Sequence, residues 1–383
     1  MKKIMIFIGG YLPGKKYGGP VTSISNFVDY LGDEYELRIV CNNHDLKETT
    51  PYHNICKGWN RVGKAEVLYL RDEQETYKTF LSILEEATPD LIYCSGTTYF
   101  RVNSKVFRAA KKLGISILLA PRGDICDNAI KIKKWKKIPY FKIMKMIGMF
   151  RGIYFHATSQ EEVNNVNKYL GIEKDKCFLL PNFPADAAPV HRNGYVKESG
   201  KIKIVFMSRI QEKKNLYDAI QIVNQLSGEV IFDIYGPSES PAYWKKCQTE
   251  MEKAPHNVKI SYKGALAPKE APMIFCNYDC FLFPTWTENY GHVIAEALQH
   301  DCPIVISKGT TPWDDVADYN AGGVAELGNL EGFVFELEKI TKMDCKEYNQ
   351  LIDRIRAYLD YKINVNALKQ EYVKMLESIV NHD

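Results

Sequence analysis

The chain has 383 residues and a formal net charge of +3. This length suggests two domains with a core each, and so small a charge excludes a general affinity for nucleic acid. No apolar run reaches the roughly 18 residues that a membrane span needs, and the stretch MKKIMIFIGG has no cleavage site for a signal peptide. We therefore expect a cytoplasmic protein.

Short β-rich runs alternate with helical patterns throughout the first half of the chain. The helical pattern GGPVTSISNFVDYLG ends at Gly32. Strongly apolar runs of this kind are typical of parallel strands that are buried on both faces. The predicted strands lie in KKIMIFIGG, YELRIVC, DLIYCSG, ISILLAPRG, IYFHATS and KCFLLPNF.

A polar, proline-containing segment at 183–200 has the composition of a linker, and the alternation starts again after it. The second set of predicted strands lies in KIKIVFMSR, VIFDIYG, NVKISYKG, DCFLFPT, PIVIS and GGVAEL. We predict an α/β protein with two Rossmann-like, doubly wound domains that face each other, at 1–190 and 191–364. The last helix, at about 365–383, is expected to pack back on the first domain.

Ligands of such sheets bind beyond the carboxyl ends of the strands, so the residues that follow each predicted strand are the candidates for a site. The first strand is followed by GGYLPGKKYGGP, whose glycines suit either close approach of an anion to the backbone or a mobile turn. It is not a G-x-G-x-x-G fingerprint, which disfavours a dinucleotide-linked dehydrogenase. The helix after it would begin near Gly18 and Gly19.

Arg209 follows the first strand of the second half, and Lys214 begins the next helical segment. Two cations at one strand end suit a diphosphate, because Arg offers a fork of donors and Lys a point charge. The alternative is a pair of ordinary surface salt bridges.

The stretch PTWTENYGHVIAEAL carries Glu288 before a predicted helix start at Gly291, and Glu296 on that helix. The amides of residues 289–292 would form an anion site at the helix N-terminus. Eight helical residues span about 12 Å, which is the scale of a nucleotide sugar from hexose to ribose. In the alternative, Glu296 faces solvent and Glu288 complements the helix dipole, although Glu296 interrupts an otherwise apolar stretch.

The segment 131–151 is basic and contains no acid, and Trp135, Tyr140 and Phe141 are interleaved with its cations. Such a helix either lies on an anionic membrane surface or forms a solvated face. The cations are Lys131, Lys133, Lys134, Lys136, Lys137, Lys142, Lys145 and Arg151. Elsewhere, Cys276 and Cys280 have helical spacing but no second pair, so we predict thiols and no metal site.

With these motifs, the sequence resembles the retaining glycosyltransferases of family 4, which have the GT-B fold. The resemblance is most specific in PTWTENYGHVIAEAL, which matches the E-x7-E motif of that family, and in CPIVISKGTTPWDDV and SRIQEKKN. GGP and APRGDICDNA resemble the donor loop and the acceptor-side loop of members that build capsular, O-antigen or exopolysaccharide chains. Asn215 stands where a glycine is commoner, and Arg122 where many relatives have histidine.

The resemblance implies that Glu296 binds the donor ribose, Glu288 the transferred sugar, and Arg209 with Lys214 the diphosphate. Residues 263–266 would pass beside the base. The implied donor site comprises Gly18, Gly19, Arg209, Lys214, Lys263, Gly264, Ala265, Leu266, Glu288, Asn289, Tyr290, Gly291, His292 and Glu296. The implied catalytic residues are Glu288, Arg209, Lys214 and Arg122, and the implied acceptor residues are Arg122, Asp124 and Thr97.

The function implied is transfer of a hexosyl group from a UDP- or GDP-linked sugar, with retention, to a hydroxyl of a glycan or lipid-diphosphate-linked oligosaccharide. Such a reaction would serve cell-surface polysaccharide biosynthesis, with no cofactor and no metal, because the two cations would stabilise the leaving diphosphate. The alternatives are a non-catalytic carbohydrate-binding subunit, a nucleotide-sugar epimerase or a phosphorylase.

Overall fold

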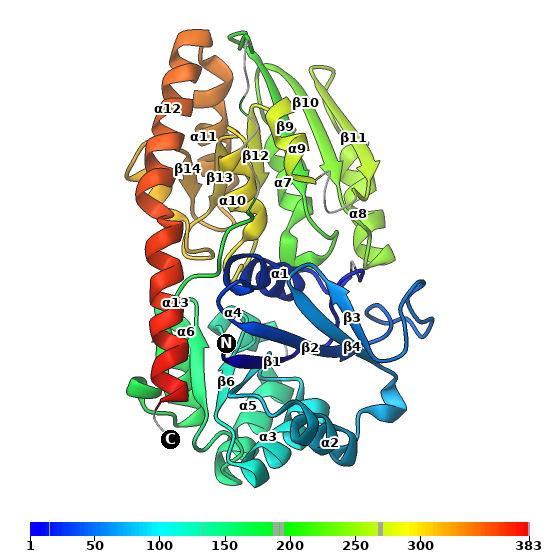
Figure 1. The fold of residues 1–383 in the computed structure, drawn as a ribbon. Coiled ribbons are helices and arrows are strands. Elements are labelled where there is room, and N and C mark those ends of the chain that lie inside the picture. The colour runs from blue at the N-terminus through cyan, green and yellow to red at the C-terminus, as the bar shows by residue number, and fades with distance from the viewer. Residues whose placement is uncertain (15, 133, 187–190, 192–194, 267–270, 382–383) are drawn as a thin grey trace. The chain divides into compact units, whose positions relative to one another are not determined.

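The computed structural model describes residues 1–14, 16–132, 134–186, 191, 195–266 and 271–381 (Figure 1). Lys133 and residues 187–190 and 192–194 of the predicted linker therefore lie outside the described residues. The chain divides into two compact units. Unit 1 comprises Met1–Asp186 and Val365–Asp383, and unit 2 comprises Ala187–Asn364.

Unit 1 is built on an eight-stranded sheet with the order β3-β4-β2-β1-β5-β6-β7-β8. The pairing is parallel except between β3 and β4, which are antiparallel. The sequence did not predict β3 and β4, which form a hairpin at the edge of the sheet. The strands are β1 (Lys3–Phe7), β2 (Glu36–Asn42), β3 (Trp59–Val62), β4 (Ala65–Leu70), β5 (Leu91–Ser95), β6 (Ile117–Ala120), β7 (Tyr154–Ala157) and β8 (Cys177–Leu179).

Helices cover both faces of this sheet, which explains why successive strand residues are buried. Met5 and Phe7 of β1 belong to one apolar cluster with α2, α3 and α5, whereas Ile4 and Ile6 belong to another with α1 and α13. The helices are α1 (Gly19–Leu31), α2 (Tyr77–Ala87), α3 (Phe100–Leu113), α4 (Asp127–Ile132), α5 (Lys134–Met146), α6 (Gln160–Asn165) and α13 (Val365–Val380).

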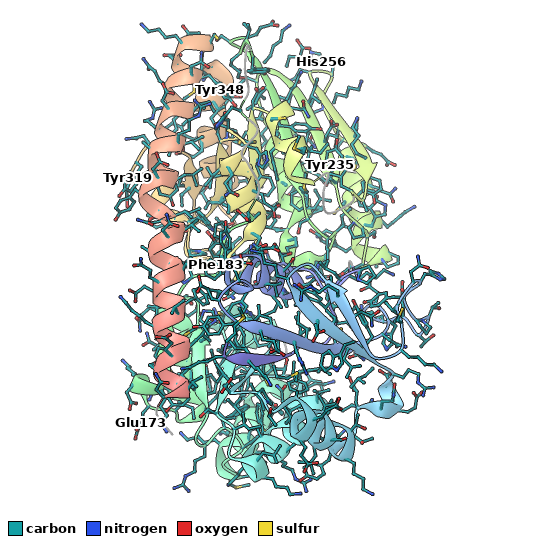
Figure 2. The ribbon with its side chains drawn as sticks, in the orientation of Figure 1. Glu173, Phe183, Tyr235, His256, Tyr319 and Tyr348 are labelled. Atoms are coloured by element: carbon teal, nitrogen blue, oxygen red, sulfur yellow. The ribbon has the colours of Figure 1, made fainter. Side chains whose placement is uncertain are left out.

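The last helix, α13, belongs to unit 1 and contributes to its core. Tyr372, Leu376 and Ile379 are buried in the cluster on the α1 face. The ring of Tyr372 stacks on Phe183, which Figure 2 labels, at a centroid distance of 4.3 Å. Residues nearly 200 positions apart in the sequence thus share one core.

Unit 2 contains a parallel six-stranded sheet with the order β11-β10-β9-β12-β13-β14, and all six strands predicted for this half are present. The strands are β9 (Lys201–Met207), β10 (Glu229–Tyr235), β11 (Val258–Gly264), β12 (Cys280–Phe283), β13 (Ile304–Ser307) and β14 (Gly323–Ala325). The helices are α7 (Leu216–Val223), α8 (Pro241–Met251), α9 (Ala271–Ile274), α10 (His292–Gln299), α11 (Leu330–Lys342) and α12 (Cys345–Lys362). One mainly parallel and one fully parallel sheet, each with helical connections, confirm the predicted α/β fold.

Among the described residues, no helix is both long enough and apolar enough to cross a bilayer.

Candidate active site

The strand order of unit 2 reverses between β9 and β12, which are neighbours in the sheet. The chain runs from β9 outward to β10 and β11, and then returns to place β12 on the other side of β9. Open α/β sheets bind ligands at such a reversal, because the loops that follow the two strands diverge there and leave a crevice. The loop after β9 carries Arg209 and Lys214, and the loop after β12 carries Glu288.

Lys214 and Glu288 form an ion pair at this point. Both side chains are largely buried, at 11% and 16% exposed, and the ammonium group lies 5.4 Å from the centroid of the Phe283 ring. Burial lowers the pKa of Lys214 well below its ordinary value, and the cations Lys213 and Arg209 lower it further, whereas the Glu239 carboxylate opposes this change. The pair thus joins the two loops of the crevice.

The backbone around Lys214 is fixed to the loop after β12. The Lys213 carbonyl accepts hydrogen bonds from the Trp286 amide (3.0 Å) and from Thr285 Oγ1 (3.2 Å). Asn215 has a φ of 59°, in the left-handed region, and its Nδ2 donates to the Pro284 carbonyl at 3.0 Å. A left-handed residue is required here, which explains why glycine is common at this position and why asparagine is tolerated.

Arg209 also contacts a carboxylate, from the loop that follows β10. Its Nη1 lies 3.0 Å from Glu239 Oε1, and both side chains are partly exposed. The Glu239 amide donates to the carbonyl of Ile210, which ties the two loops together. The sequence analysis did not identify Glu239, because no motif marks it.

The helix α10 begins at His292, directly after Gly291, whose φ of 74° lies in the left-handed region that favours glycine. Tyr290 is buried, and its carbonyl accepts a hydrogen bond of 2.6 Å from Nε1 of the buried Trp313. The His292 ring lies 4.8 Å from the Tyr290 ring. The Tyr290 carbonyl and the left-handed Gly291 therefore fix the backbone at the start of α10.

Glu296 lies one turn into α10 and is half-buried. Burial raises the pKa of its carboxyl to about 7. Within the part of the chain that the structure describes, no hydrogen bond or ion pair joins this carboxyl to another residue. A half-buried carboxyl of this kind is suited to the hydroxyl groups of a ligand.

The predicted base-contact segment 263–266 lies at the carboxyl end of β11, the edge strand of the sheet. Lys263 Nζ lies 3.5 Å from Oδ1 of the buried Asp233, and the Gly264 carbonyl accepts a hydrogen bond from the Gly236 amide at 2.9 Å. Ala265 is exposed, and Leu266 is partly buried against the core of unit 2.

In unit 1, Arg122 follows β6 and is held by neutral groups. Its Nη2 donates to Tyr93 Oη at 2.8 Å, its Nη1 donates to Asn182 Oδ1, and its own φ is 55°. Tyr93 Oη lies 2.6 Å from Nδ1 of His156, which is fully buried. Because Arg122 only donates, the Tyr93 proton points to His156, and the imidazole is neutral with its proton on Nε2.

The His156 ring is held on its other side by the Leu180 carbonyl at 3.0 Å and by Tyr372 Oη at 3.2 Å. Burial and the Arg122 charge lower the pKa of His156 to about 3. Sequence reasoning missed His156, Tyr93, Asn182 and Tyr372, which come from separate strands, a loop and the last helix.

The side chain of Glu162, which is completely buried, holds the loop that carries Arg122. Its carboxylate accepts hydrogen bonds from the amides of Gly123 (2.6 Å) and Thr158 (2.8 Å). Burial raises the pKa of Glu162, and these hydrogen bonds oppose the change. Nothing in the sequence pattern distinguishes this glutamate from its exposed neighbour Glu161.

Asp124 and Thr97 are near each other, but only one of them is accessible. Asp124 Oδ2 accepts a hydrogen bond of 2.8 Å from the hydroxyl of Thr98, which is exposed. Thr97 has no exposed surface, and its carbonyl accepts from Tyr140 Oη at 2.9 Å. The hydroxyl that accompanies Asp124 at the surface is therefore that of Thr98, not that of Thr97.

In the glycine loop after β1, one glycine accommodates an aromatic ring and two others lie at the start of α1. A side chain at Gly10 would meet the Tyr17 ring at 2.0 Å, so this glycine makes room for an aromatic side chain of the same loop. Gly18 is the N-cap of α1, and Gly19 is the first residue of this helix. A Cβ atom at Gly19 would meet no other atom within 4 Å. Gly18 and Gly19 belong to unit 1, whereas Lys214 and Glu288 belong to unit 2.

Residues 188–358 match the family model of glycosyl transferases group 1. This part of the chain is therefore similar to that family. The matched region covers unit 2, including every residue of the Lys214–Glu288 crevice. A 41.2 kDa protein in the cps region of Klebsiella pneumoniae is 24% identical over 374 residues, which cover 94% of this chain and 97% of that protein.

Solved structures show the same fold over the whole length. HepE from Anabaena, in complex with UDP and glucose, superposes with a TM-score of 0.72 at 15% identity, covering 99% of this chain and 100% of HepE. WaaG, a glycosyltransferase involved in lipopolysaccharide biosynthesis, superposes with a TM-score of 0.68 at 12% identity, covering 97% and 99%. These matches confirm the predicted GT-B fold.

Proposed function

We propose that the protein transfers a hexosyl group from a UDP- or GDP-linked sugar to a hydroxyl of a glycan or lipid-diphosphate-linked oligosaccharide, with retention of the anomeric configuration. The observation that carries this proposal is the Lys214–Glu288 pair at the strand reversal of a group 1 glycosyl transferase unit. The complex of HepE with UDP and glucose supports a nucleotide sugar as donor. The relative in the cps region and WaaG support a place in cell-surface polysaccharide biosynthesis.

Donor binding would exchange the partner of Lys214. A diphosphate carries more negative charge than a carboxylate, so Lys214 would turn from Glu288 toward the phosphates, and Arg209 would turn likewise from Glu239. The released Glu288 carboxylate would accept hydrogen bonds from the transferred sugar. Each cation would then have an anionic partner both in the free protein and in the donor complex, which keeps the free-energy cost of burying its charge low.

In the transfer, the bond between the anomeric carbon and the phosphate oxygen breaks, and its electron pair stays on the diphosphate. The acceptor oxygen forms the new bond to the anomeric carbon from the same face, and its proton passes to the departing phosphate oxygen. Arg209, Lys214 and the first amides of α10 stabilise the growing negative charge. We propose that these groups act without a divalent metal and that Glu296 binds the donor ribose.

The acceptor is assigned to the carboxyl edge of the sheet in unit 1, where Arg122, Asp124 and Thr98 present polar groups. Arg122 is a fixed cation there, because its partners Tyr93 and Asn182 are neutral. A fixed cation suits an acceptor that carries a phosphate, such as a lipid diphosphate.

Peripheral contact with an anionic membrane through residues 131–151 is part of the proposal, and the exposed side of α5 supports it. Trp135, Pro139, Ile143 and Met146 lie at helical spacing and are all exposed, with Trp135 at 75% and Met146 at 79%. Lysines at 134, 136, 142 and 145 surround this stripe. An apolar stripe bordered by cations is typical of a helix at a membrane interface.

Release of UDP or GDP from a panel of nucleotide sugars, with and without acceptor glycans, tests the reaction. We expect acceptor-dependent release that persists in EDTA, with products in which the donor configuration is retained. A protein that binds the nucleotide sugar but releases no nucleotide with any acceptor would be a carbohydrate-binding subunit instead. Complete loss of activity in EDTA, restored by a divalent ion, would overturn the metal-free proposal.

A further inference from the structure

A groove of about 540 Å³ runs along one side of α3 in unit 1. Phe100, Ser104, Phe107 and Lys111 line it at helical spacing, so it extends over about 16 Å of the helix. Apart from Arg108 of α3, its other lining residues come from 114–117 and from 147–153, the segment between α5 and β7. None of the residues that hold Arg122 lines this groove, so it is separate from the acceptor edge.

The walls of the groove are mainly apolar. Phe107, Ile117 and Ile153 are buried beneath it, and Met149 and Ile147 border it. Ile147 is 58% exposed although it is a large aliphatic residue. Exposed apolar surface next to an apolar groove indicates that a ligand with an extended hydrocarbon part would be bound there.

Three cations line the same groove, namely Arg108, Lys111 and Arg151, and no acidic residue does. Arg108 lies over the ring of Tyr77 at 4.9 Å. In the described part of the chain, the side chains of Lys111 and Arg151 form no ion pair with a carboxylate. A ligand of this groove would therefore combine an anionic group with its hydrocarbon part.

Arg151 also borders a second cavity of about 500 Å³, on the other side of residues 148–152. Lys145 and Lys176 line that cavity together with one acid, Glu173, which Figure 2 labels. The positive charge thus continues around the end of α5, where Met146 and Ile147 are exposed.

We propose that the groove along α3 binds one anionic phospholipid of the membrane, with an acyl chain along the helix and the phosphate against Lys111 and Arg151. A free phosphate would leave the apolar walls of the groove uncovered. A lipid without net charge would leave its three cations without a net negative charge to neutralise them. The site goes beyond the proposed transfer reaction. It shares with the proposed membrane contact only the exposed end of α5, so the lipid would hold unit 1 on the bilayer.

The test uses dioctanoyl phosphatidylglycerol below its micellar concentration with the full-length protein, and isothermal titration calorimetry as the measurement. We expect saturable binding of one lipid per chain, weaker binding of dioctanoyl phosphatidylcholine, and no detectable binding of inorganic phosphate in the same range. Lys111→Glu with Arg151→Glu should weaken binding by about tenfold or more, because both charges are reversed. The matched control is Lys57→Glu with Lys78→Glu, two exposed lysines of unit 1 outside the groove, which should bind as the unmodified chain does.

A second variant tests the hydrocarbon part of the site. Ser104→Trp fills the groove without changing its charge and should also abolish lipid binding, while circular dichroism and the melting temperature without lipid report on its folding. Unchanged binding in Ser104→Trp, or equal binding of phosphate and phosphatidylglycerol, would overturn the proposal. Nucleotide release from the donor sugar is measured in parallel, so failure of the lipid site is distinguishable from failure of the transferase function.

Discussion

In unit 2, Lys214 and Arg209 each contact a carboxylate, whereas in unit 1 Arg122 is held by a tyrosine hydroxyl and an asparagine carbonyl. The difference lies in what an incoming anion must displace. Glu288 and Glu239 neutralise their cations in advance, so a diphosphate would replace one anionic partner by another. Arg122 keeps its partners and its net charge, so it would add an attraction without giving up a contact.

The two arrangements also differ in how they are built. Both cations of unit 2 lie on the loop after β9, and their partners lie on the loops after β10 and β12, the two neighbours of β9 in the sheet. Arg122 depends on a chain of buried groups that passes through Tyr93 and His156 to Tyr372 of α13. We therefore expect mutations at the unit 2 pair to change mainly turnover, and mutations in the Arg122 network to change both turnover and the stability of unit 1.

The largest effect is expected when the Lys214–Glu288 pair is broken. Lys214→Ala and Glu288→Gln should each lower kcat by about 100-fold, equivalent to about 2.7 kcal/mol in the transition state, and the double variant should lose little more than either single one. Steady-state kinetics with saturating donor measures this. Lys346→Ala is the control, because this exposed lysine on α12 of unit 2 lies outside the loops that carry the pair; strictly additive losses would contradict the pair acting as a unit.

A smaller effect on turnover is expected from Tyr93→Phe, which removes the hydroxyl between Arg122 and His156. Kcat should fall by about tenfold with the KM for the donor unchanged, and urea unfolding should show a loss of about 1–3 kcal/mol, because two buried polar groups lose a partner. Tyr154→Phe on β7 is a comparable change outside the network. A stability loss without any change in kcat would show that the network does not position Arg122 for the reaction.

The buried imidazole of His156 predicts a pH effect on stability. Its pKa of about 3 lies below the ordinary value of 6.5, so the unfolded chain binds this proton first and stability falls as the pH drops from about 6.5 toward 3. The free energy of unfolding should lose about 1 kcal/mol per pH unit from this group alone. His156→Gln should remove that contribution between pH 6 and pH 4; an unchanged slope would show that His156 does not titrate in this way.

The smallest effect concerns Glu296, where function and stability are expected to oppose each other. Its pKa of about 7 lies above the ordinary value of 4.5, so the stability it provides is complete below pH 4.5 and is lost as the pH rises through 7. Glu296→Gln should therefore stabilise the protein by up to about 1 kcal/mol at pH 8 and leave it unchanged at pH 4. The same variant should bind UDP or GDP more weakly in a thermal-shift titration; equal binding would remove the proposed ribose contact.

Much of unit 2 was predictable because its site residues are close together in the sequence. Glu288, Gly291 and Glu296 lie within one strand-loop-helix stretch, and each predicted strand of this half is present. The pairing of Lys214 with Glu288 was not predictable, since it depends on β9 and β12 being neighbours in the sheet. The edge hairpin β3–β4 was not predictable, because its strands are only partly buried and their sequences show only a weak apolar pattern.

The sequence by itself determined the alternation of strands and helices, the start of α10 at a left-handed glycine and the similarity of unit 2 to group 1 glycosyl transferases, because each depends on residues that are near one another along the chain. The tertiary structure alone decided which charges meet. His156 and Tyr372 are 216 positions apart, Thr97 is buried while Thr98 is exposed, and the groove along α3 is completed by residues that follow α5. Burial and partner choice are properties of the packed sheet, so no local pattern contains them.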